Sequence, residues 1–248
     1  MKLKDRTVWI IGASTGIGRE LAFELARRGA RLCLSARSAD KLHAIVKDLA
    51  GSGHRYEAFD AADPKAMAQA YQNLLGQGFK PDSAIYMAGQ YAPAPIAKAN
   101  AEDAQTIINV NLVGALNMVQ NVLPDMLANK RGQIALCASV AGYRGLPNAQ
   151  PYGATKAALI NYAESLYSET MGQGLDIKVI NPGFVKTPMT DKNDFPMPMM
   201  MSAEEAAVAL ADGLEGNGFE IHFPKKFTYL MKLLKFLPNA IYFRIVPR

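Results

Sequence analysis

Short apolar runs alternate along the chain with longer segments whose apolar residues recur every three or four positions. The first pattern predicts buried strands and the second predicts amphipathic helices. The expected strands cover 7–11, 31–35, 55–59, 83–87, 133–137 and 176–180, and the expected helices cover 19–28, 39–50, 64–75, 101–129 and a segment starting at 152. Strands that alternate with helices, without an internal repeat or a linker, indicate a single α/β domain with a doubly wound parallel sheet and right-handed crossovers.

A glycine-rich turn joins the first strand to the first helix. Gly12, Gly16 and Gly18 have the spacing Gly-x-x-x-Gly-x-Gly, with Ser14 and Thr15 between them. Glycines let the backbone approach a phosphate closely, and the free N–H groups of a helix start favour negative charge. The turn therefore predicts a variant dinucleotide-binding loop, for which a merely tight turn is the alternative.

The second strand ends at Ala36-Arg37-Ser38. An NAD site places a carboxylate near this point to bind the ribose hydroxyl, whereas an arginine suits the extra phosphate of NADP. We therefore expect NADP(H) here, with the alternative that Arg37 is solvated and Ser38 only caps the next helix. Asp60, at the tip of the third strand, is placed to meet the adenine, and Asp63-Pro64 is expected to start the following helix.

A tyrosine and a lysine four residues apart form the second candidate site. If Pro151 opens a helix, Tyr152 and Lys156 lie on one face, and the ammonium favours the phenolate form of the tyrosine. Such a pair can transfer protons at neutral pH, and Ser139 follows the preceding strand. Asn111 interrupts the apolar stripe of the long helix, so its amide is either satisfied by backbone and water or directed into a site.

Composition narrows the class of protein. The chain has 248 residues and a net charge of +5, but six of its basic residues and no acidic ones lie in 225–248, so the remainder carries a net charge of −1. A nucleic-acid-binding body is not indicated. Cys33 and Cys137 lie in apolar runs, as buried reduced thiols do, and we expect a cytoplasmic protein without a signal peptide or a spanning helix. The histidines have no metal-ligand spacing, so no metal is expected.

These motifs in this order resemble the short-chain dehydrogenase/reductase family up to about His222. The resemblance implies a Rossmann-like sheet of order 3-2-1-4-5-6-7, Tyr152 as catalytic acid or base, Ser139 on the substrate oxygen and Lys156 on the nicotinamide ribose. It also implies that Asn111 holds a water of the proton relay. One departure is Met87, which stands in Tyr86-Met87-Ala88-Gly89 where the family usually has a hydrogen-bonding asparagine, and which puts local rigidity in doubt.

The expected catalytic set and cofactor site follow from the motifs and the resemblance together. The catalytic set is Asn111, Ser139, Tyr152 and Lys156. The cofactor is expected to contact Gly12, Ser14, Thr15, Gly16, Ile17, Gly18, Arg37, Ser38, Asp60, Ala88, Gly89, Tyr152, Lys156, Pro182, Gly183, Val185 and Thr187.

The expected function is an NADP(H)-dependent oxidoreductase that transfers a hydride between the nicotinamide and a hydrophobic ketone, aldehyde or secondary alcohol. The alternatives are a non-catalytic NADP-binding sensor or scaffold, and a membrane-surface enzyme of sterol or 3-oxoacyl metabolism. Five methionines lie in 189–201, a region that the resembling family uses as a mobile substrate lid. They suit apolar ligands of irregular shape, or they only pack against the helix that starts near Ser202.

The last segment, 225–248, reads as a basic amphipathic tail of the catalytic domain 1–224. Phe227, Leu230, Met231, Leu234 and Leu237 are expected on one helical face, opposite Lys225, Thr228, Lys232 and Lys235. This helix could lie on an anionic membrane surface, cover the substrate mouth or pack against a second subunit. We expect a homodimer or homotetramer.

Overall fold

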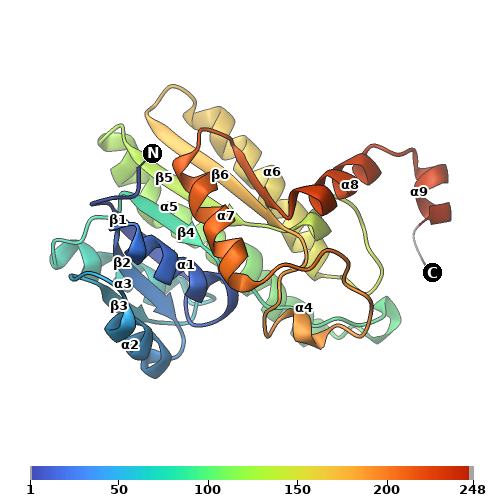
Figure 1. Cartoon of the computed structure of the whole chain (residues 1–248), viewed down its shortest axis with the longest axis horizontal. Helices are drawn as coiled ribbons and strands as arrows, with labels where there is room; N and C mark the ends of the chain where they lie inside the picture. Colours follow the sequence, from blue (N-terminus) through green and yellow to red (C-terminus); the bar gives the residue numbers. More distant parts are fainter. Residues whose placement is uncertain (1, 246–248) are drawn as a thin grey trace.

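A seven-stranded, all-parallel sheet of order β3-β2-β1-β4-β5-β6-β7 forms the centre of the computed structural model, which describes residues 2–245 (Figure 1). The sheet order confirms the predicted fold class. The strands are β1 Thr7–Ile11, β2 Arg31–Ala36, β3 Arg55–Ala58, β4 Ser83–Tyr86, β5 Gly132–Cys137, β6 Leu175–Pro182 and β7 Glu220–Phe223. The helices are α1 Gly16–Arg27, α2 Ala39–Asp48, α3 Pro64–Gly76, α4 Ala101–Ile108, α5 Gly114–Ala128, α6 Tyr152–Thr170, α7 Ala203–Glu215, α8 Lys225–Lys235 and α9 Asn239–Ile245.

Helices cover both faces of the sheet, which explains why its central strands are apolar throughout. Alternate residues of a strand point to opposite faces. In β1, Trp9 and Ile11 pack with α3, α5 and α6, whereas Val8 and Ile10 pack with α1, α2 and α7. The carboxyl ends of the strands meet at one edge, where the candidate motifs come together.

The long helix predicted over 101–129 is interrupted. The π-helical turn η2, Asn109–Val113, separates α4 from α5 and contains Asn111. The hydroxyl of Tyr86 donates a hydrogen bond to the carbonyl oxygen of Val110 in this turn. A π turn inside a helix often marks a functional site, and this one faces the carboxyl edge of the sheet.

The whole helical segment Ala101–Ala128, including its π turn, is long and apolar enough to span a membrane by length and composition. The expectation of a chain without a spanning helix therefore depends on how deeply this segment is buried. Its α5 part places Ala115, Met118, Val119 and Val122 in the core against the sheet, with at most 1% of each exposed. Since a core helix passes the same test, we interpret this segment as a core helix.

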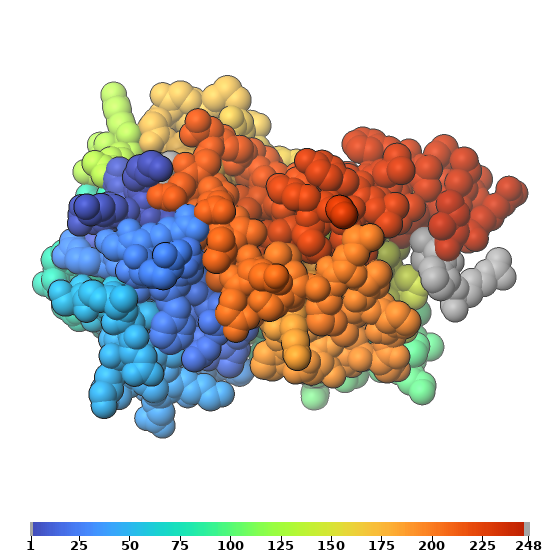
Figure 2. All heavy atoms as spheres, in the orientation of Figure 1, coloured from blue at the N-terminus to red at the C-terminus, as the bar shows by residue number. Residues whose placement is uncertain are grey.

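The C-terminal segment extends from one end of the molecule, where Figure 2 shows it in red. The prediction of its faces is partly wrong. Phe227 and Met231 are buried as expected, but Thr228 is fully buried and Leu230 is 47% exposed. The helix is therefore rotated relative to its apolar stripe, and residues 246–248 of the predicted tail lie outside the described residues.

The junction of α5 with the sheet has no room for a side chain at Gly114. A Cβ atom there would lie 2.1 Å from the Tyr86 hydroxyl oxygen and 2.5 Å from the carbonyl oxygen of Ala61. We expect Gly114→Ala to lower the free energy of unfolding by about 1–3 kcal/mol, measured by chemical denaturation. The control is Gly76→Ala, which has no atom within 4 Å and should be neutral or slightly stabilising. Equal effects of the two substitutions would contradict this account of the packing.

Candidate active site

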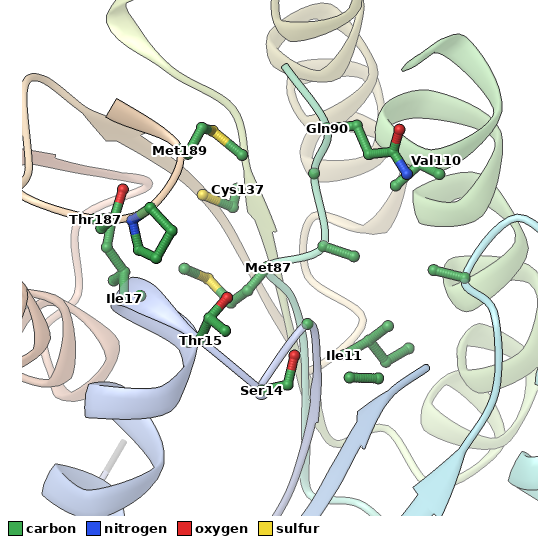
Figure 3. A pocket seen from close by; sticks show the side chains of 18 of the residues that line it. Ile11, Ser14, Thr15, Ile17, Met87, Gln90, Val110, Cys137, Thr187 and Met189 are labelled. Carbon is green, nitrogen blue, oxygen red and sulfur yellow. The ribbon is translucent and has the colours of Figure 1, made fainter. Parts of the chain in front are cut away.

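A cavity of about 430 Å³ lies at the carboxyl edge of the sheet. In Figure 3, side chains from distant parts of the chain surround it, among them Thr15, Met87, Cys137 and Met189. Asn111 lies fully buried behind the wall of the cavity. Every residue predicted to contact the cofactor lines this cavity, as does Ser139: Gly12, Ser14, Thr15, Gly16, Ile17, Gly18, Arg37, Ser38, Asp60, Ala88, Gly89, Tyr152, Lys156, Pro182, Gly183, Val185 and Thr187.

The glycine turn is packed so tightly that two of its positions exclude any side chain. A Cβ atom at Gly12 would lie 2.3 Å from the backbone nitrogen of Ala88, and one at Gly18 would lie 2.2 Å from the carbonyl oxygen of Gly12. Helix α1 begins at Gly16 and not at Arg19 as predicted, so two glycines lie in its first turn. This turn therefore offers bare backbone to the cavity.

Two helix starts at the cavity lack the side-chain caps found elsewhere. Asp63, Asn100 and Ser202 each accept a backbone hydrogen bond as the N-cap of their helix. Thr15 and Ser38 occupy the N-cap positions of α1 and α2, yet their side chains make no capping bond. The alternative that Ser38 serves only as a cap is therefore not supported. The uncapped N–H groups and the two hydroxyls suit the phosphates of a dinucleotide.

Cationic side chains stand at the α2 end of the cavity. Arg37 lines it as predicted, and Lys41 in the first turn of α2 adds a second cation that the sequence analysis missed. Its signal was its position in the first turn of the predicted helix, directly after Arg37 and Ser38. Asp60 lines the same end, and its carboxylate accepts a hydrogen bond of 2.9 Å from the backbone nitrogen of Ala62.

Ser139, Tyr152 and Lys156 meet at the opposite end. Tyr152 is the first residue of α6, so Pro151 precedes the helix and does not open it as predicted. Lys156 is 3% exposed, its Nζ donates a hydrogen bond of 2.6 Å to the carbonyl oxygen of Cys137, and it lies 5.4 Å from the ring centroid of Tyr152. The Ser139 hydroxyl oxygen accepts a hydrogen bond of 3.1 Å from the backbone nitrogen of Ala141.

Burial has the largest effect on the pKa of the Tyr152 hydroxyl. Burial raises the pKa of the Tyr152 hydroxyl well above its ordinary value, and a hydrogen bond with Ser139 acts in the opposite direction. Burial also lowers the pKa of the Lys156 ammonium. In this arrangement burial therefore opposes the effect on the pKa of Tyr152 that was expected from Lys156.

The buried amide of Asn111 joins three elements of the site. Its Oδ1 accepts a hydrogen bond of 2.6 Å from the backbone nitrogen of Gln90, and its Nδ2 donates to the carbonyl oxygen of Gln90 (3.0 Å) and to the Thr155 hydroxyl (3.2 Å). Thr155 in turn donates to the carbonyl oxygen of Tyr152 at 2.7 Å. The Asn111 side chain is therefore satisfied by protein groups, which is the first of the two alternatives, and is not directed into the cavity.

This network also bears on Met87, the departure from the family pattern. Met87 is half-buried, and its backbone nitrogen donates to the carbonyl oxygen of Ile11 at 2.7 Å. Three residues further on, Gln90 is held by Asn111 through both of its backbone groups. The loop after β4 is thus fixed by its backbone on both sides of the methionine.

Tyr91 connects the catalytic end to the lid segment, residues 189–201, and no sequence motif indicated this role. Its ring meets the ring of Tyr152 edge-on at a centroid distance of 4.9 Å. Its hydroxyl donates to Oδ1 of Asn193 at 3.0 Å, and Nζ of Lys192 donates to its carbonyl oxygen at 3.0 Å. The lid is therefore latched directly beside the predicted catalytic tyrosine.

The lid methionines divide between the two predicted roles. Met189 lines the cavity, whereas Met201 bridges to Val185 and packs against the core beside α7. Met199 and Met200 are exposed.

Comparison with known proteins identifies the family. The model of the short chain dehydrogenase family matches residues 6–196. An uncharacterized oxidoreductase of Myxococcus xanthus is 33% identical over 243 residues, which cover 97% of this chain and 96% of the relative. The chain therefore belongs to the short-chain dehydrogenase/reductase family, whose members are oxidoreductases that use NAD(P)(H).

Other relatives agree with this assignment. The 3-oxoacyl-[acyl-carrier-protein] reductase FabG of Thermotoga maritima is 29% identical over 194 residues, covering 77% of this chain and 79% of the relative. The crystal structure of a short chain dehydrogenase from Burkholderia cenocepacia in complex with NADP matches with a TM-score of 0.87 and 23% identity, over the full length of both chains. At this identity the match establishes the fold alone.

The hydrogen bond between Tyr91 and Asn193 can be tested without an assay of activity. Tyr91→Phe keeps the ring against Tyr152 but removes one neutral hydrogen bond, so amide hydrogen exchange of residues 190–193 should rise by about 2- to 10-fold. Tyr56→Phe, a half-exposed tyrosine on β3, is the matched control and should leave this exchange unchanged. Unaltered exchange in Tyr91→Phe would show that the hydroxyl does not hold the lid.

Proposed function

We propose that this protein is an NADP(H)-dependent carbonyl reductase that acts on hydrophobic ketones or aldehydes and, in reverse, on secondary alcohols. The observation that carries the proposal is the placement of Ser139, Tyr152 and Lys156 at one end of a cavity whose other end is a glycine cradle with two uncapped helix starts. A dinucleotide bound along this cavity would have its nicotinamide beside Tyr152.

The chain's own residues supply orientation and a proton. The nicotinamide supplies the hydride. Tyr152 donates its proton to the substrate oxygen, and the Ser139 hydroxyl donates a hydrogen bond to the same oxygen as negative charge develops there. Lys156 uses one of its three donors on Cys137, which leaves two for the ribose hydroxyls.

A protonated Tyr152 is the form required for reduction of a carbonyl, and the same residue accepts the proton in the reverse reaction. Its raised pKa keeps the hydroxyl in the acid form through neutral pH, and the acid form is the one that donates a proton. The apolar lining of the cavity, which includes Met87 and Met189, supports a hydrophobic substrate. A 3-oxoacyl thioester, the kind of substrate that the name of the Thermotoga maritima relative indicates, is one such carbonyl compound.

Three further parts of the proposal concern the whole molecule. We propose that residues 1–224 form the catalytic unit and that 225–248 are its tail. A cytoplasmic location is supported by Cys33 and Cys137, which are free and buried. Assembly into a homodimer or homotetramer stays a prediction.

Tyr152→Phe tests the role of the proton donor. We expect kcat to fall by at least about 10²- to 10⁴-fold, because positioned proton transfer contributes that much, whereas the Kd for NADPH stays unchanged. NADPH absorbance measures turnover and fluorescence titration measures binding. Full activity in this variant would falsify the assignment of Tyr152 as proton donor. Turnover of NADPH by the wild type would distinguish an enzyme from the alternative of a sensor or scaffold.

Arg37→Ala tests the choice of cofactor. Losing a hydrogen-bonded contact with the 2′-phosphate should raise the KM for NADPH by about 10- to 100-fold and leave the KM for NADH nearly unchanged. Lys41→Gln should act in the same direction with a smaller effect. Arg31→Ala, an exposed arginine at the opposite end of β2, is the control. An equal rise for both cofactors in Arg37→Ala would refute the NADP preference.

A further inference from the structure

The outer side of α8 carries a stripe of large apolar side chains that nothing in the described chain covers. Tyr229, Leu230, Leu233 and Phe236 recur with helical spacing and are between 47% and 80% exposed. We call these four residues the tail face. In α9, Ile241 and Phe243 are also exposed. Figure 2 shows that this segment stands out from the body, so it is accessible to a large partner.

The tail face is exposed because the other side of α8 is firmly attached to the body. A Cβ atom at Gly183 would lie 2.6 Å from the Phe227 ring, which shows how closely that ring packs there. The hydroxyl of Thr228 lies 2.6 Å from Nδ1 of His222, and Lys232 forms an ion pair of 2.6 Å with Glu220. The helix therefore cannot turn its apolar outer side inward without breaking these contacts.

The end of the segment is attached as well. Arg144 donates hydrogen bonds of 2.9 Å to the carbonyl oxygens of Lys235 and Leu237, and its guanidinium lies 4.2 Å above the ring of Tyr242. The hydroxyl of Tyr242 donates to the carbonyl oxygen of Gly145 at 2.6 Å. These contacts fix α8 and α9 to the loop between Ser139 and Tyr152, so the tail face is a preformed surface.

Within the C-terminal segment the unpaired charges have one sign. No acidic residue follows Glu220, and Glu220 is already paired with Lys232. The exposed cations Lys225, Lys226, Lys235 and Arg244 form no ion pair within the described part of the chain. An apolar stripe flanked by unpaired cations complements a surface that is anionic outside and apolar beneath.

We propose that the tail face docks on an anionic lipid bilayer, with its apolar side chains at the acyl boundary and the flanking cations among the phosphate headgroups. A second copy of the chain fits this surface less well. A symmetric contact would bring the tail face against itself, so the cations of both copies would meet without an acidic residue of the segment to neutralise them.

The inner side of α8, opposite the tail face, is connected to the lid by aromatic contacts. The Phe227 ring on the inner side of α8 packs against Phe184 at 5.1 Å, and Phe184 packs against Phe195 of the lid at 6.0 Å. The docking itself requires no turnover and is independent of the proposed activity.

Flotation of the full chain with vesicles tests the proposal. We expect binding to vesicles of phosphatidylglycerol and phosphatidylcholine in equal parts, and much weaker binding to pure phosphatidylcholine. Leu233→Gln combined with Phe236→Gln should lower the partition coefficient by about tenfold or more, because both side chains lose their apolar burial. Lys225→Gln combined with Lys226→Gln should lower it by a similar factor on the anionic vesicles alone.

The matched control is Met171→Gln, which replaces an equally exposed apolar side chain at the end of α6 and should leave vesicle binding unchanged. Unchanged NADPH binding and unfolding midpoints would confirm that all variants fold. Failure of the wild type to bind anionic vesicles would overturn the proposal, as would equal binding to both lipid compositions. A wild-type dimer would also overturn the proposal if Leu233→Gln combined with Phe236→Gln dissociated it, because a second copy would then cover the tail face.

Discussion

A buried amide that must find hydrogen-bond partners holds the candidate site together. Asn111 lies in a π turn of the long helix, and its side chain can be satisfied only if the loop after β4 and helix α6 approach it closely. This requirement fixes Gln90 on one side and Thr155 on the other. Because Thr155 bonds to the carbonyl of Tyr152, the position of the predicted proton donor depends on the same amide.

The sequence allowed the sheet, the glycine turn and the polar groups at the strand ends to be predicted, because each depends on local spacing or on a motif. Contacts between distant segments were not predictable in this way. Tyr91, for example, meets Asn193 across 102 positions. The pKa of Tyr152 was not predictable because spacing shows a neighbouring cation but not the burial that opposes its effect.

The orientation of the C-terminal helix was also not predictable from the sequence, because it depends on contacts with distant segments. Its apolar periodicity indicated an amphipathic helix, but long-range contacts decide which residues face the body. Glu220 binds Lys232 and His222 binds Thr228, so two polar residues face the body while Leu230 faces outward. Leu230, which periodicity placed on the buried face, thus became part of the outer surface.

The central claim is that the chain positions a carbonyl compound for hydride transfer from NADPH. The most direct measurement is turnover of the wild type with NADPH that carries deuterium on the transferring carbon of its nicotinamide, against a panel of long-chain ketones, sterols and 3-oxoacyl thioesters. We predict an alcohol product with one deuterium on the former carbonyl carbon, detected by mass spectrometry. Tight binding of NADPH without transfer to any member of the panel would contradict this account.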